Sequence, residues 1–186
     1  MNWITKFIKP KIVSLFKKKT SETDQILWTT CECKNLIYRE DLQKNFNCCP
    51  KCGSHHKLSC VERFQVLFDN KEFELIDTPQ PKDDPINFVD TKKYTDRLKL
   101  ARKITKQEDA VAIATGSIEN IRVTVGAQDF RFIGGSFGAA SGEAFIHGVQ
   151  HAIDNKNPFI FFSCSGGQRM MESSIALMQM SRTVLA

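Results

Sequence analysis

The amino-acid sequence predicts an α/β layered domain that follows a small cysteine-rich module. Six of the seven cysteines lie between positions 31 and 60. After position 108, strand-like apolar segments alternate with segments that have helical spacing. Two Gly-Gly pairs, at 134–135 and 166–167, each follow an apolar run and precede a helix-like segment. Strands that alternate with helices are typical of an α/β fold with a crossover connection.

Length and charge favour one main domain, one small module and a basic N-terminal arm. The 186 residues are enough for one hydrophobic core and a module. The first twenty positions hold six lysines and no acidic residue, so we assign residues 1–26 to a basic arm. The other positions hold 20 basic and 21 acidic side chains. Residues 21–186 are therefore nearly neutral, which argues against a general nucleic-acid binder, because such a protein has a basic surface on its folded domain.

Neither a membrane span nor a secretory signal is predicted. No apolar run has the length needed to cross a bilayer. The N-terminal segment contains Pro10 and lacks a small-residue cleavage site. We expect a flexible or partner-docked arm, with a membrane-surface helix as the alternative. An odd number of cysteines without a secretory signal favours a reducing compartment, so we predict a cytoplasmic protein.

Residues 27–56 have the pattern of a zinc ribbon. In Cys49-Pro-Lys-Cys52-Gly, two thiolates at knuckle spacing bind one ion, and the glycine permits the turn that follows. The first pair, Cys31-Glu-Cys33, is one residue shorter than a usual knuckle. We predict one structural zinc bound by Cys31, Cys33, Cys49 and Cys52. Cys48 is an alternative ligand, and a ribbon that folds without metal is the other alternative.

The remaining residues, 57–186, follow the α/β pattern in order. Helical spacing covers 61–68, 92–104, 139–154 and 168–186, and strand-like segments are 73–76, 109–116, 121–128, 130–133 and 159–162. Glu119-Asn120 is placed to turn a hairpin, and three prolines make 78–89 a loop. In the helix over 168–186, Met171, Ile175, Leu177 and Met178 form an expected buried stripe. Ala186 follows an apolar run without a capping residue, so we expect the C-terminal part of the domain to be missing.

The two Gly-Gly pairs are the main candidate site. Glycine lets the backbone turn sharply and lets a ligand approach closely. N–H groups at a helix start lack intrahelical partners and lie at the positive end of the dipole. Each pair therefore predicts backbone donors for an anion, either a phosphate or a developing oxyanion. The motifs of zinc proteases, serine hydrolases and Walker-type ATP sites are each incomplete here.

Several motifs, in order, closely resemble the β subunit family of bacterial acetyl-coenzyme A carboxylase carboxyltransferases. The similarity runs from about Trp28 to the last residue. It includes the four-cysteine ribbon, Lys92-Lys-Tyr94-x-Asp96-Arg97-Leu98, Gly134-Gly-Ser-Phe-Gly138, Ser163-x-Ser165-Gly-Gly-x-Arg169-Met170-x-Glu172 and Leu177-Met-Gln-Met180.

This resemblance implies a crotonase-like fold with an N-terminal zinc ribbon. It also implies carboxyl transfer from carboxybiotin, held on a biotin carboxyl carrier protein, to acetyl-CoA, which gives malonyl-CoA for fatty-acid synthesis. By the same resemblance, Gly166 and Gly167 supply backbone donors to the thioester oxyanion, and Gly134 and Gly135 shape the coenzyme A side. The implied partners are a carboxyltransferase α subunit, biotin carboxylase and the carrier protein.

Two other functions stay open on the sequence alone. A carboxyltransferase for propionyl-type substrates would share the same fold. A zinc-ribbon module that binds nucleic acid or a protein partner would use the glycine-rich part only as a scaffold, and it predicts salt-sensitive nucleic-acid binding.

Overall fold

The structure, a computed structural model, describes residues 27–186. The chain divides between His56 and Lys57 into two compact units. The basic arm assigned to residues 1–26 lies outside the described residues, and the three-part domain division stays a prediction. Within the described residues, no helix has the length and apolar character needed to cross a membrane.

The described part of the first unit is a short hairpin followed by a helix. Strands β1 (Trp28–Thr30) and β2 (Leu36–Tyr38) pair antiparallel, and α3 (Arg39–Lys44) follows. Trp28 and Tyr38 face each other across the hairpin in an edge-to-face contact, with ring centroids 5.3 Å apart. The small core consists of Cys31, Ile37, Leu42 and Cys49. So few buried residues cannot stabilise a fold by themselves, which favours metal-dependent folding.

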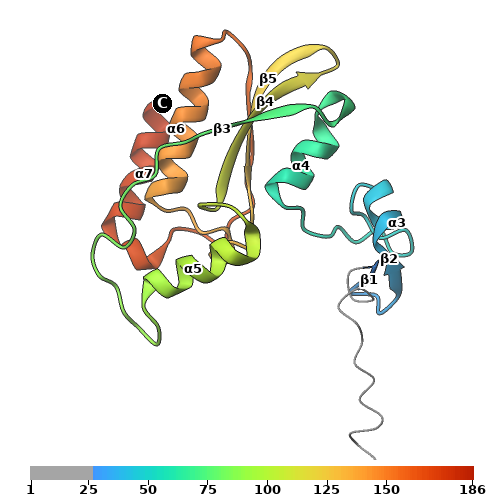
Figure 1. Cartoon of the computed structure of the whole chain (residues 1–186), viewed down its shortest axis with the longest axis horizontal. Helices are drawn as coiled ribbons and strands as arrows, with labels where there is room; N and C mark the ends of the chain where they lie inside the picture. The colour runs from blue at the N-terminus through green and yellow to red at the C-terminus, as the bar shows by residue number, and fades with distance from the viewer. Residues whose placement is uncertain (1–26) are drawn as a thin grey trace, which may run out of the picture. The chain divides into compact units, whose positions relative to one another are not determined.

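The second unit is built around a mixed four-stranded sheet in the order β3-β4-β5-β6 (Figure 1). Its strands are β3 (Phe73–Ile76), β4 (Val111–Ile118), β5 (Ile121–Gln128) and β6 (Phe159–Phe162). The first three pair antiparallel, and β6 pairs parallel to β5. Antiparallel neighbours need only a tight turn, whereas the parallel pair requires a crossover. Helix α6 (Ala139–Asp154) is that crossover, as expected.

Helices cover both faces of this sheet. Helix α4 (Cys60–Leu67) packs Cys60 and Phe64 against Ala114, Val125 and their neighbours on one face. On the opposite face, Ile113 packs with Ala144 of α6. Successive strand residues point to opposite faces, so both faces of β4 and β5 carry apolar side chains. Figure 1 shows α6 and α4 on opposite sides of the sheet, with α7 (Ser174–Leu185) beside α6.

The hairpin between β4 and β5 turns at Glu119-Asn120, as predicted. Both residues have positive φ, +49° and +65°. Both N–H groups donate to the Asp69 carboxylate, at 3.0 and 2.9 Å. Asp69 thus fixes a turn 50 residues further along the chain, which local sequence does not reveal.

Helix α5 (Tyr94–Thr105) begins two residues later than predicted and buries Tyr94, Leu98 and Ala101 as expected. The basic residues Arg97 and Arg102 pair with Asp90 and Asp83, each at 2.6 Å. These two cations are therefore neutralised within the chain.

Two predicted elements are wrong. Residues 130–133 form a turn that leads into a 3₁₀ turn, η2 (Ile133–Gly135), because Phe132 is fully buried and its N–H donates to the Asp129 carbonyl. The last helix begins at Ser174 rather than at 168, after another 3₁₀ turn, η3 (Met170–Glu172). Leu177 and Met178 are exposed, and α7 buries Ala176 and Gln179 instead.

Candidate functional site

The two glycine pairs lie at the ends of neighbouring parallel strands. The first, Gly134-Gly135, follows β5, and the second, Gly166-Gly167, follows β6. Carboxyl ends of parallel strands meet at one edge of a sheet, which is where ligands bind in open α/β folds. The structure thus brings together two loops that are 32 positions apart in the sequence.

Direct hydrogen bonds join the two loops. The Gly166 N–H donates to the Gly134 carbonyl, and the Phe137 N–H donates to the Gly167 carbonyl, both at 2.9 Å. Gln128, at the end of β5, donates to the Gly135 carbonyl at 2.6 Å and accepts from the Cys164 N–H at 3.3 Å. These bonds fix one loop relative to the other.

Glycine is required where the loops meet. Gly135 has a φ of +63°, and a Cβ atom there would collide with the carbonyl oxygen of Cys164. Its neighbour Gly134, with a φ of +66°, has open space around it but a left-handed backbone. Ile133 shares the positive φ, +47°, which is unusual for a β-branched residue. The turn is therefore held by its surroundings rather than by local preference.

Neither glycine pair opens a helix directly, contrary to the expectation from sequence. Helix α6 begins four residues after Gly135, and its first N–H group already holds an anion from the chain itself. The Ala139 N–H donates to the Glu172 carboxylate at 2.6 Å. A Cβ atom at Gly138 would lie 2.7 Å from both oxygens of that carboxylate. Glu172 therefore fills the predicted anion position at the start of α6.

A buried ionic network lies beneath the glycine loops. The Arg169 side chain is 1% exposed and forms a two-point contact with Asp109, at 2.5 and 2.8 Å. The same guanidinium donates to the Ser136 carbonyl at 2.6 Å and to the Ser136 hydroxyl at 3.1 Å. Arg169 thus connects the loop after β6 to the loop after β5.

Tyr94 and Glu172 complete this network. The Tyr94 hydroxyl donates to Glu172 at 2.6 Å, and Arg169 contacts Glu172 at 3.3 Å. Burial lowers the pKa of Arg169, but the Asp109 carboxylate outweighs burial and the net pKa is raised. Burial also raises the pKa of Tyr94 well above its ordinary value, against the opposing charge of Arg169. Both groups therefore keep their protons at neutral pH.

A mostly apolar cavity of about 320 Å³ borders the second glycine loop. Its apolar lining comes from β6, α6, α7 and the first loop: Phe137, Phe145, Phe161 and Met180. Ser163, Ser165 and Gly167 lie at its polar side. Gly167 is exposed and lines the cavity, so a ligand there can reach its backbone, and the adjacent Gly166 is exposed as well.

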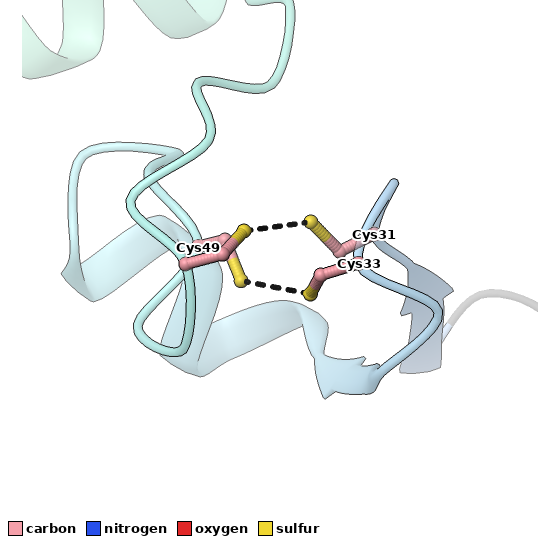
Figure 2. Close-up of side chains that lie close together, drawn as sticks. Cys31, Cys33 and Cys49 are labelled. Atoms are coloured by element: carbon pink, nitrogen blue, oxygen red, sulfur yellow. Dashed lines mark hydrogen bonds between the residues drawn. The ribbon is translucent and has the colours of Figure 1, made fainter.

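The four predicted zinc ligands come together in the first unit. The sulfur atoms of Cys31, Cys33, Cys49 and Cys52 all lie within 4.8 Å of one another. Two of the distances are 3.5 Å (Cys31 to Cys52) and 3.9 Å (Cys33 to Cys49). Figure 2 shows Cys31, Cys33 and Cys49 with their side chains directed toward one another. Tetrahedral zinc–thiolate bonds separate the sulfurs by about 3.8 Å, so the cluster fits zinc.

The local backbone and its neighbours support this cluster. Lys34 has a φ of +63° and its N–H donates to the Cys31 carbonyl, which lets the short Cys31-x-Cys33 knuckle turn back. The Asn35 amide donates to the Cys33 sulfur at 3.3 Å and lowers the pKa of that thiol to about 6. Cys48 is not a member of the cluster, and its thiol donates to the Phe46 carbonyl. The alternative of Cys48 as a ligand is therefore not supported.

Comparisons with known proteins give a family match in each of the two units. The acetyl-CoA carboxylase zinc finger domain family matches residues 28–52, and the carboxyl transferase domain family matches residues 83–186. The chain belongs to the carboxyl transferase domain family. Proteins named acetyl-coenzyme A carboxylase carboxyl transferase subunit beta, from Pelagibacter ubique and a Jannaschia species, are 46% and 42% identical over the whole chain. The chain spans 61% and 58% of their lengths.

A solved structure shows the same fold. The transcarboxylase 12S structure with bound methylmalonyl-coenzyme A superposes with a TM-score of 0.51 and 25% identity, over 68% of this chain and 22% of that chain. The second unit is therefore a crotonase-like α/β carboxyl transferase domain. The first unit carries a structural zinc ribbon, as predicted.

Sequence reasoning missed most of the ionic network in this carboxyl transferase domain. Arg169 and Glu172 appear in the sequence only as part of a family motif, whereas in the structure Glu172 accepts from the Ala139 N–H at the start of α6 and Arg169 donates to the Ser136 carbonyl. Asp109 was not singled out. The only signal in the sequence was an acidic residue two positions before the apolar strand β4. Cys60 is buried, and burial raises the pKa of its thiol to about 12, so it is unreactive.

Proposed function

We propose that this chain acts as the β-type subunit of an acetyl-CoA carboxylase carboxyltransferase. The observation that carries the proposal is an exposed glycine loop on a mostly apolar cavity, in a domain of the carboxyl transferase family. A thioester in the cavity would present its carbonyl oxygen to backbone N–H groups, while apolar side chains would exclude water from the reacting carbon.

In the proposed reaction, the acetyl methyl group loses a proton and negative charge develops on the thioester oxygen. A new carbon–carbon bond then forms to the carboxyl carbon as its bond to the biotin nitrogen breaks. The methyl proton ends on that nitrogen, so atoms and charge balance. The products are malonyl-CoA and biotin. Fixed backbone donors stabilise the developing charge without any titratable side chain.

Within this proposal, Gly166 and Gly167 are the oxyanion loop, and Gly134 and Gly135 shape the coenzyme A side. The fixed contacts between these loops support a site that is organised before substrate binds. The partners would be a carboxyltransferase α subunit, biotin carboxylase and a biotin carboxyl carrier protein. We also propose a cytoplasmic location, which the seven unpaired cysteines support.

The test is carboxyl transfer by the chain assembled with a carboxyltransferase α subunit. In the reverse direction, malonyl-CoA and biotin should give acetyl-CoA, and neither subunit alone should do so. The proposal fails if the assembled pair gives no acetyl-CoA while malonyl-CoA remains intact.

A second candidate is a carboxyltransferase for propionyl-type thioesters. It is favoured by one observation, the similarity to transcarboxylase 12S, which was solved with methylmalonyl-coenzyme A. Parallel assays with malonyl-CoA and methylmalonyl-CoA decide between the two. We expect a higher kcat/KM for malonyl-CoA, and a preference for methylmalonyl-CoA would select the second candidate.

A further inference from the structure

The two proposed oxyanion donors are held in very different ways. The Gly166 N–H donates to the backbone carbonyl of Gly134 at 2.9 Å, within the contact between the loops. The Gly167 N–H donates at 3.0 Å to the hydroxyl of Ser165, an exposed side chain. A backbone carbonyl cannot leave without moving its loop, whereas a serine hydroxyl leaves by rotation about one bond. Only the Gly167 donor is easily released.

The backbone around the Gly167 N–H is fixed without help from Ser165. On one side, the Gly166 N–H is bonded to Gly134, and on the other, the Gly167 carbonyl accepts from the Phe137 N–H at 2.9 Å. The next bond along, from the Arg169 N–H to the Phe137 carbonyl, is also 2.9 Å. Loss of the serine hydroxyl therefore frees the donor but leaves the loop in place.

Ser165 also lies where an incoming ligand would meet it. It lines the cavity together with Gly167, and its hydroxyl donates to the Gly167 carbonyl at 3.1 Å while it accepts from the Gly167 N–H. The hydroxyl therefore occupies the position from which a thioester oxygen would approach that N–H.

We propose that Ser165 is a positioning residue that gates the Gly167 N–H, an inference that rests on the proposed function. Without substrate, its hydroxyl satisfies this donor. When a thioester binds, the hydroxyl rotates toward solvent and the N–H passes to the thioester oxygen. Gly167 is then the working donor of the pair, and Gly166 holds the two loops together.

If Ser165 gates the site, its hydroxyl and the thioester oxygen compete for the Gly167 N–H, and this competition can be measured. A neutral intramolecular hydrogen bond shifts an equilibrium by about 2- to 10-fold. Ser165→Ala should therefore raise kcat/KM for malonyl-CoA by about 2- to 10-fold in the assembled carboxyltransferase, because the donor no longer has a competing acceptor. Ser165→Thr retains a hydroxyl and should behave like the wild type.

A first experiment tests the gate in the chain alone, independently of catalysis. Amide hydrogen exchange of Gly167, followed by nuclear magnetic resonance on the full chain, should become about 5-fold faster in Ser165→Ala. Ser163→Ala is the matched control, because Ser163 lines the same cavity and makes no side-chain hydrogen bond among the described residues. An unchanged Gly167 exchange rate in Ser165→Ala would overturn the proposal.

The measurement of kcat/KM for malonyl-CoA then distinguishes a gating hydroxyl from one that assists the reaction or has no effect on it. A fall in kcat/KM in Ser165→Ala would show that the hydroxyl assists the reaction, and an unchanged value would show that it does not compete; either result overturns the gate. If the wild-type assembly transfers no carboxyl group, the proposed function fails, and the exchange experiment still decides whether Ser165 holds the Gly167 N–H.

Discussion

Replacement of Arg169 by methionine should strongly destabilise the second unit. Methionine fills a similar volume but leaves the carboxylates of Asp109 and Glu172 without their shared cation. Arg169 is 1% exposed and Asp109 is 5% exposed, so water cannot replace the lost contacts. Removal of one partner from a buried ion pair costs about 3–5 kcal/mol.

The remaining contacts of the two carboxylates set the expected magnitude. Asp109 would still accept from the Ser141 hydroxyl at 2.6 Å and from the Ala110 N–H at 2.8 Å. Glu172 would keep its bonds from Tyr94 and from the start of α6. These donors reduce the penalty, whereas the Ser136 carbonyl loses a donor and adds about 1 kcal/mol. We therefore expect the free energy of unfolding to fall by about 4 kcal/mol.

Urea unfolding followed by circular dichroism measures this loss, with zinc present so that the first unit stays intact. Arg182→Met is the control, because Arg182 is bonded to Glu143 on the surface with its side chain 41% exposed. That change should cost less than about 1 kcal/mol. Equal losses in the two variants would refute the view that the network holds the fold. Arg169→Lys should fall between them, because lysine keeps the charge but cannot bridge Asp109 and Ser136.

Two further predictions concern the zinc ribbon and the buried tyrosine. Cys49→Ala should abolish zinc binding in native mass spectrometry, whereas the adjacent Cys48→Ala should retain one zinc per chain; equal zinc content in both would contradict the ligand assignment. In a Tyr38→Phe chain, Tyr94 is the only tyrosine. Its folded-state pKa is raised above the ordinary value of 10.0. Its contribution to stability is therefore complete below pH 10 and is lost as the pH rises further, and phenolate absorbance should appear only with unfolding. Phenolate absorbance in the folded chain near pH 10 would contradict the buried hydrogen bond.

The elements with a clear local pattern were predictable from the sequence. β3, β5, α6 and β6 have the predicted bounds. For β5 and α6 a clear hydrophobic period adjoins an asparagine or glycine, and β6 is a short apolar run that directly follows Pro158. The zinc ligands were also predictable, since metal binding depends on residue type and spacing. The prediction of a strand over residues 130–133 was wrong because the apolar Phe132 is fully buried, and a buried apolar residue in a turn cannot be distinguished in the sequence from one in a strand.

The internal organisation of the site could not be predicted, because it depends on contacts between distant residues. Arg169 and Asp109 are 60 positions apart, and Tyr94 and Glu172 are 78 apart. Which acceptor each glycine N–H group is bonded to depends on tertiary contacts in the same way. The sequence led us to propose Gly166 and Gly167 as donors, but only the structure shows that the N–H of Gly166 is bonded to Gly134 and that of Gly167 to Ser165.

The proposed function requires that backbone N–H groups, not side chains, stabilise the negative charge that develops during carboxyl transfer. Its most direct test is Gly167→Ala in the assembled carboxyltransferase. The backbone φ of +123° is strained for alanine, but no atom beyond the adjacent residues lies within 4 Å of the added Cβ, so stability should fall by only about 1–3 kcal/mol. Displacement of the N–H should lower kcat by about 100-fold or more. A folded variant that keeps wild-type kcat would contradict this requirement.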